Sequence, residues 1–163
     1  MKCLVFSDSH GNIYYMNRAL SQHPDAEVVF FLGDGIYDAD AIRAMDTRPR
    51  MWIAVRGNCD FHKFFDGREA RRREEITLES RKILLTHGDA YGVKSSLSHL
   101  EDYAKERGAD IVLFGHTHTP TEIYVNEERP IYFFNPGSIS SPSYSYGILT
   151  LGESVLFSHG SFA

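Results

Sequence analysis

The sequence predicts one α/β domain, residues 1–163, in which two sheets pack face to face and helices cover the outside. Three observations lead to this class. The first half alternates short apolar runs with amphipathic stretches. The second half ends in strand-like runs alone. The chain has 163 residues and is 42% hydrophobic, which suffices for a single buried core.

The first half reads as strand, helix, strand, helix, strand. Strands are expected at 2–7, 27–32 and 50–55. Asn12 is expected to cap a helix that carries Ile13, Met16, Ala19 and Leu20 at helical spacing, and a second helix is expected around 37–45. This alternation predicts parallel strand pairing with right-handed crossovers.

The second half changes character. Residues 74–88 read as two strands joined near Glu79 to Arg81, and Ser95 or Ser96 is expected to cap a helix that ends at Gly108. Further strands are expected at 110–115, 121–125, 130–135, 146–151 and 154–159. The charged run at 66–75 mixes both signs, so we interpret it as a solvated connector.

The bulk properties exclude several classes of protein. No apolar run approaches the roughly 20 residues of a membrane helix, and the apolar part of the N-terminus is too short for a secretory signal. Two cysteines make no disulfide framework, so a cytoplasmic location is expected. A net charge of −5 argues against a nucleic-acid partner.

Function is indicated by the polar residues that follow the apolar strands. Five apolar runs are each followed by a glycine-flanked polar cluster. In chain order, the five clusters contain Asp8 with His10, Asp34, Asn58 to Asp60, His87, and His116 with His118. Asp8 and His10, two residues apart, are expected on one side of an extended strand end. Ligands gather at the carboxyl ends of strands in open α/β sheets, so the clusters are expected to converge.

Each cluster alone is explained at least as well by a turn, a helix cap or a structural histidine. Together they offer carboxylate, carboxamide and imidazole groups, which suit Mn, Fe, Zn, Ni or Mg. Seven candidate side chains exceed one tetrahedral site, and two metals sharing a bridging carboxylate fit them better.

The wording and order of these clusters resemble a known family. "DSHGN", "GDG", "GNCD", "THG" and "GHTH" are similar to the signature blocks of the calcineurin-like metallophosphoesterases, and "NPGS" at 135–138 is similar to their small prokaryotic phosphodiesterase branch. The resemblance implies a four-layer α/β/β/α sandwich of two mixed sheets. It also implies one metal held by Asp8, His10 and His118, another held by Asn58, His87 and His116, and Asp34 as the bridge.

The same resemblance implies an activity. A phosphodiesterase with two divalent ions, Mn²⁺ being expected and Ni, Fe, Zn or Mg being alternatives, would hydrolyse small phosphodiesters by attack of a metal-bridging hydroxide. The alternative is a protein-binding scaffold without activity, like a retromer-subunit relative. Every expected ligand position holds a suitable residue, which favours the hydrolase. The expected partner is a small phosphate ester, and no membrane partner is expected. The sequence leaves open whether the protein forms a homo-oligomer.

The block "RGNCD" departs from the larger phosphatases of this superfamily. Asn58, Cys59 and Asp60 are candidate catalytic residues, but Cys59 stands where those phosphatases carry a histidine that assists the leaving oxygen. Asp60 retains the acid that accompanies this histidine. A thiol is a poorer general acid than an imidazolium at neutral pH. A thiolate nucleophile or a metal ligand are the alternative roles of Cys59.

A second departure from the family concerns the residues that would bind the phosphate of the substrate. Relatives often carry a basic residue shortly after the Pro-Gly-Ser block, whereas residues 138–146 contain none, which puts a phosphate-binding cation from this loop in doubt. The histidine ligands also need acceptors for their second ring nitrogens, for which Asp89 or backbone carbonyls are candidates.

Overall fold

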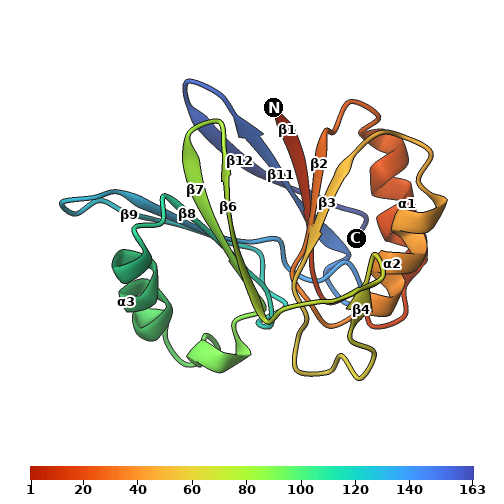
Figure 1. Ribbon diagram of the computed structural model, residues 1–163, viewed down its shortest axis with the longest axis horizontal. Helices are drawn as coiled ribbons and strands as arrows, with labels where there is room; N and C mark the ends of the chain where they lie inside the picture. Colours follow the sequence, from red (N-terminus) through yellow and green to blue (C-terminus); the bar gives the residue numbers. More distant parts are fainter.

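The computed structural model describes residues 1–163 and shows two five-stranded sheets packed face to face, with helices on both outer sides (Figure 1). The first sheet has the order β12-β11-β1-β2-β3, with bounds Val155–Ser161, Ser145–Leu151, Lys2–Phe6, Val28–Phe31 and Met51–Ala54. The second has the order β6-β7-β8-β10-β9, with bounds Arg73–Leu78, Arg81–Thr86, Ile111–Phe114, Ile131–Asn135 and Thr121–Val125. The helices are α1 (Ile13–Gln22), α2 (Ile36–Met45) and α3 (Ser98–Arg107).

The pairing confirms the predicted parallel strands. β1, β2 and β3 pair in parallel, as do β7, β8 and β10, whereas β11, β12, β6 and β9 pair antiparallel to their neighbours. Both sheets are therefore mixed, and the implied sandwich of two mixed sheets flanked by helices is confirmed. None of the helices combines the length and apolar character needed to cross a membrane.

The packing explains why the central strands are continuous apolar runs. Leu4 and Phe6 of β1 pack in the layer that contains α1 and α2, whereas Cys3 and Val5 pack between the sheets. Alternate side chains of one strand point to opposite faces, so both sets must be apolar when both faces are covered. A third apolar layer holds α3 against the second sheet.

Two predicted helix caps differ in the structure. Asn12 occupies the N-cap position of α1, but its side chain makes no capping hydrogen bond. The N-cap position of α3 is Leu97 instead of Ser95 or Ser96. The Ser96 hydroxyl accepts the Ser98 N–H at 3.1 Å, so it supports the turn before the helix.

The predicted connector at 66–75 is only partly irregular. Phe64–Phe65 (β4) and Arg68–Glu69 (β5) form a short hairpin, and β6 begins at Arg73. Asp66 and Gly67, with φ of 49° and 71°, make the tight turn between the two short strands. An Asp-Gly pair readily adopts this backbone and marks hairpins.

Candidate metal centre

The candidate ligands lie where the carboxyl ends of the parallel strands meet, at the lower edge of the molecule in Figure 1. Asp8 and Asp34 follow β1 and β2 of the first sheet, whereas His87 and His116 follow β7 and β8 of the second. The two sheets are joined here by a hydrogen bond of 2.7 Å between His87 Nδ1 and the Leu32 carbonyl oxygen.

The backbone at this edge departs from the extended strand end that we expected for Asp8 and His10. β1 ends at Phe6, and five of the candidate ligands have left-handed φ values: 56° for Asp8, 44° for His10, 56° for Asp34, 68° for His116 and 61° for His118. Such conformations are unfavourable for residues with a Cβ and cluster at functional sites. They turn side chains of the three loops after β1, β2 and β8 toward one another in a way that an extended strand cannot.

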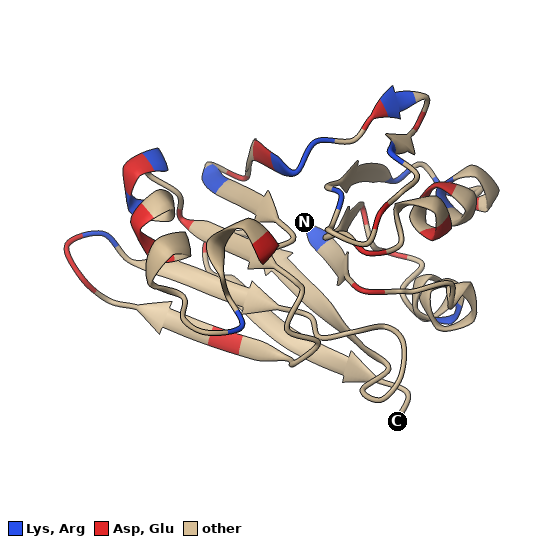
Figure 2. Cartoon of the chain, turned by 90° about the horizontal axis from the view of Figure 1, so that it is seen from below, with Lys and Arg blue, Asp and Glu red and all other residues tan.

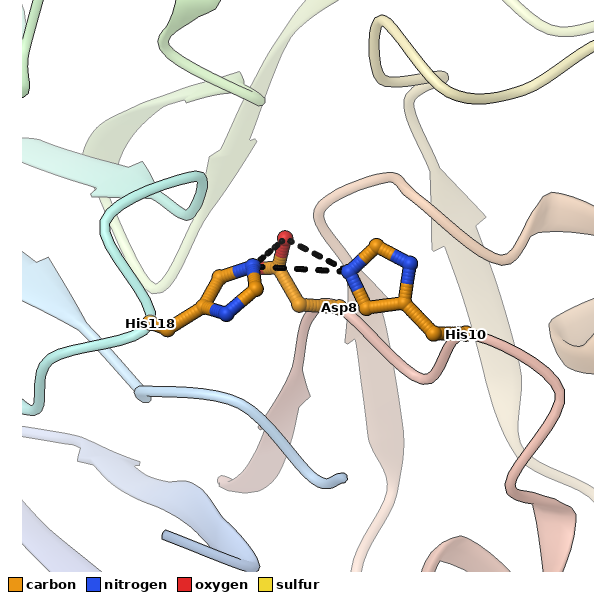
Figure 3. A group of neighbouring side chains, drawn as sticks. All are labelled: Asp8, His10 and His118. Carbon is orange, nitrogen blue, oxygen red and sulfur yellow. Dashed lines mark hydrogen bonds and ion pairs between the residues drawn. The ribbon is translucent and has the colours of Figure 1, made fainter. Parts of the chain in front are cut away.

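One group of ligand atoms joins two segments that are far apart in the sequence. Asp8, His10 and His118 point toward one another (Figure 3), with ligand atoms all within 4.8 Å. Asp8 Oδ1 lies 3.1 Å from His118 Nε2 and 3.8 Å from His10 Nε2. This oxygen is fully buried and has no hydrogen-bond partner.

A second group lies beside the first. Asp34, His87 and His116 also bring their ligand atoms within 4.8 Å of one another. His87 Nε2 lies 3.2 Å from Asp34 Oδ2 and 3.2 Å from His116 Nδ1. It is also 3.9 Å from Asp8 Oδ1, so the two groups are adjacent.

The charges of the second group are strongly coupled. Burial acts to lower the pKa of His87, but the hydrogen bond to Asp34 and the charges of Asp8 and Asp34 raise it overall. Burial acts to raise the pKa of Asp34, but His87 and the Cys59 N–H hold it below its usual range. Burial and the neighbouring His87 lower the pKa of His116. Asp34 is thus anionic and His116 neutral, the states in which both bind a metal.

The donor set fits divalent metal ions. A buried carboxylate oxygen without a partner is costly, and here it faces imidazole nitrogens from three different histidines. Carboxylate and imidazole donors suit first-row divalent ions. His87 also satisfies the expectation of a backbone carbonyl acceptor for its second nitrogen, through Leu32.

Asp60 connects the Gly-Asn turn after β3 to the loop that carries Asp34. Its Oδ1 accepts the N–H groups of Gly35 and Ile36, both at 2.8 Å, at the start of α2. Its Oδ2 accepts the N–H groups of Asp34 at 2.9 Å and Gly57 at 2.7 Å. Four donors on one carboxylate fix the position of Asp34 relative to the Gly-Asn turn, and the negative charge suits a helix N-terminus.

The close approach of these loops requires a glycine at position 57. A Cβ on Gly57 would meet the Asp34 carboxylate and lie 2.7 Å from the Asp34 backbone nitrogen. A side chain here would push the two loops apart.

Three supporting residues have no counterpart among the sequence-based candidates. Asp38 of α2 accepts the Ser9 hydroxyl at 2.6 Å and the Gly11 N–H at 2.7 Å, and so holds the loop of Asp8 and His10. Asn135 donates to the Gly115 carbonyl at 2.9 Å, and Ser138 donates to the Asp8 carbonyl at 2.8 Å. The "NPGS" block was the available signal for the last two.

The remaining candidates lie at the exposed rim of the centre. The Cys59 N–H donates to Asp34 Oδ1 at 2.8 Å, and Asn58 Nδ2 donates to Cys59 Sγ at 3.4 Å. Desolvation and the nearby Asp34, Asp60 and Asp8 carboxylates raise the pKa of the Cys59 thiol. The thiol is therefore neutral at physiological pH. Asp89 pairs with Arg72 at 3.4 Å, and its carboxylate makes no hydrogen bond to a histidine of the centre.

We expect Cys59→Ser to retain turnover within about threefold of wild type, because an exposed neutral thiol supplies no thiolate and donates weakly. The measurement is kcat for hydrolysis of an activated phosphate ester by metal-loaded protein. Loss of a true general acid would instead cost about 10²–10⁴-fold. A loss of that size would restore a direct chemical role for Cys59.

The two-sheet sandwich with adjacent carboxylate–imidazole groups at its strand ends agrees with the metallophosphoesterase class that the sequence resembles. The model of the calcineurin-like phosphoesterase superfamily domain matches residues 1–154, and the chain belongs to this family of metal-binding phosphoric ester hydrolases. It is 36% identical over 157 residues to the probable metallophosphoesterase YsnB of Bacillus subtilis, covering 93% of this chain and 85% of the relative. It is 30% identical over 171 residues to the phosphodiesterase YfcE of Escherichia coli K12, covering 91% and 87%.

Solved structures share the fold at lower identity. A novel archaeal phosphodiesterase superposes with a TM-score of 0.78 at 22% identity, over 99% of this chain and all of the other. Vacuolar Protein Sorting 29 from Cryptosporidium parvum superposes with a TM-score of 0.74 at 17% identity, over 99% and 97%. The fold is therefore common to proteins with quite different names, and function has to be argued from the site.

Proposed function

We propose that the protein is a dinuclear-metal phosphodiesterase that hydrolyses small phosphodiesters, with Mn²⁺ as the working ion. The observation that carries this proposal is the partnerless buried oxygen of Asp8, which belongs to the first ligand group and lies 3.9 Å from His87 Nε2 of the second. The 30% identity to the phosphodiesterase YfcE supports a diester substrate.

Two divalent ions, when bound, neutralise phosphoryl charge and make a water molecule nucleophilic at neutral pH. The residues of this chain would hold the two ions and keep them in position. Asp8, His10 and His118 would hold one ion, and His87, His116 and Asn58 the other. Asp34 would lie between them, kept in place by Asp60. Cys59 supplies no proton donor comparable to a histidine, which disfavours poor leaving groups and is consistent with an activated ester as substrate.

The test uses protein stripped with EDTA and reloaded with Mn²⁺, with hydrolysis of bis-p-nitrophenyl phosphate as the readout. We expect turnover that requires the metal, two ions per chain by elemental analysis, and loss of more than about a hundredfold in Asp34→Asn. Asp102→Asn, on the exposed side of α3, is the matched control and should behave as wild type.

The alternative remains a protein-binding scaffold without activity. It predicts no turnover by the metal-loaded wild type with any of Mn²⁺, Ni²⁺, Fe²⁺, Zn²⁺ or Mg²⁺. That result, or full activity of Asp34→Asn, would overturn the proposed function.

A further inference from the structure

A groove of about 690 Å³ lies beside the metal centre, between the start of β6, the short helix η1 (Asp89–Tyr91) and α3. We call it the arginine groove, and its main lining residues are Arg71, Arg72, Arg73, Tyr91, Tyr103 and Arg107. Figure 2 shows basic and acidic positions alternating along the chain that leads from the β4–β5 hairpin into β6. This is the charged run that the sequence suggested to be a solvated connector.

None of the proposed metal ligands lines the groove, but two of its lining residues are close neighbours of His87 in the sequence. Thr86 and Asp89 both line it and flank His87 in the sequence. Residues two positions apart have Cα atoms within about 7 Å. Arg73 lies opposite Thr86 in the β6–β7 pairing, so the basic end of β6 is brought to the same edge as the metal ligands.

The cations of the groove are incompletely neutralised. Its lining contains four arginines and three carboxylates, in a chain whose net charge is −5. Arg107 has a strong partner in Glu75 at 2.6 Å, which Lys82 also contacts at 3.0 Å. By contrast, Arg72 and Arg71 make only long contacts of 3.4 Å and 3.6 Å to their acidic partners.

Arg73 has no acidic partner at all. Its guanidinium lies 5.1 Å from the Tyr103 ring centre and donates to the Tyr91 hydroxyl at 3.2 Å. The ring contact and the hydrogen bond orient Arg73 without neutralising it. Because the Tyr91 oxygen accepts from Arg73, its own proton is available to a ligand oxygen. Arginine forks and a hydroxyl donor together match the oxygens of a phosphate.

We propose that the arginine groove binds a second phosphate of the substrate, outside the ester bond that is cleaved. The inference rests on the proposed phosphodiesterase function and specifies its substrate class: a phosphodiester with a neighbouring phosphomonoester.

The binding test uses Mn²⁺-loaded protein, because the metal centre then holds one phosphate and only a second phosphate on the same ligand is left for the groove. Calorimetry compares thymidine 3′,5′-bisphosphate with thymidine 5′-monophosphate. We expect wild type to bind the bisphosphate about tenfold more tightly, and Arg72→Gln/Arg73→Gln to lose this difference. Tyr91→Phe should reduce it in part. Arg68→Gln, in the same charged run but outside the groove, should keep it.

The kinetic test measures how metal-loaded protein hydrolyses two esters. These are thymidine 5′-(p-nitrophenyl phosphate) and its 3′-phosphate derivative. We expect wild type to favour the derivative through a lower KM, and the ratio of the two kcat/KM values to fall about tenfold in the double variant. Equal binding of both nucleotides by wild type, or an unchanged ratio in the double variant, would overturn the groove proposal alone. Absence of turnover with either ester, while bisphosphate binding persists, would overturn the proposed function and leave the groove standing.

Discussion

Asp8→Asn is expected to stabilise the metal-free protein while abolishing its response to metal. The wild-type carboxylate is fully buried, and its Oδ1 has no hydrogen-bond partner. An asparagine can keep an oxygen where Oδ2 accepts the His116 N–H, and its amide nitrogen can donate to His118 Nε2, now 3.1 Å from Oδ1. We expect the free energy of unfolding to rise by about 1–2 kcal/mol, because a buried charge becomes a hydrogen-bonded neutral group.

The measurement is the thermal midpoint with EDTA and with Mn²⁺. Metal at about a hundred times its Kd stabilises the wild type by about 2.7 kcal/mol, so its midpoint should rise by several degrees. The variant should show a higher metal-free midpoint, no rise with Mn²⁺ and no turnover. Asp102→Asn controls for loss of a surface charge. If Asp8→Asn kept the wild-type response to Mn²⁺, Asp8 would not be a metal ligand.

Asp60→Asn is expected to be nearly as destabilising as Asp60→Ala. Both carboxylate oxygens are used as acceptors, each for two backbone N–H groups. An amide presents its own donor to one of these pairs in either orientation, so two N–H groups lose their acceptor. We expect a loss of about 2–3 kcal/mol in the metal-free protein, since each unsatisfied donor costs about 1–3 kcal/mol and water replaces part of the loss.

The measurement is urea unfolding in EDTA, which separates this structural role from catalysis. Asp25→Asn is the matched control, because its only ion pair is to Lys2 on the surface and contributes little. A wild-type midpoint for Asp60→Asn would show that the carboxylate does not support these loops. The role suggested by the superfamily, an acid accompanying a leaving-group donor, would then be favoured.

Most strands could be predicted because their signal is local. β1, β2 and β8 are covered on both faces, so each is a continuous apolar run, and the polar cluster after each run marks its carboxyl end. The short hairpin at 64–69 was missed, although Asp66-Gly67 is a recognisable turn signal, because strands of two residues carry no periodicity. The predicted cap of α3 was wrong because Ser96, whose hydroxyl accepts the Ser98 N–H, lies one residue before the N-cap position at Leu97.

By itself, the sequence determined the family, the strand order along the chain and the residues that follow each strand, because each of these is written in consecutive residues. Only the tertiary structure decided which of those residues meet. Asp8 contacts His118 across 110 positions, and His116, two residues before it, joins the other group because left-handed backbone turns the two side chains apart. Arg73 likewise becomes part of a groove only because β6 pairs with β7 and α3 brings Tyr103 beneath its guanidinium. Contacts of this kind depend on how separate elements pack, and no local pattern of residues encodes them.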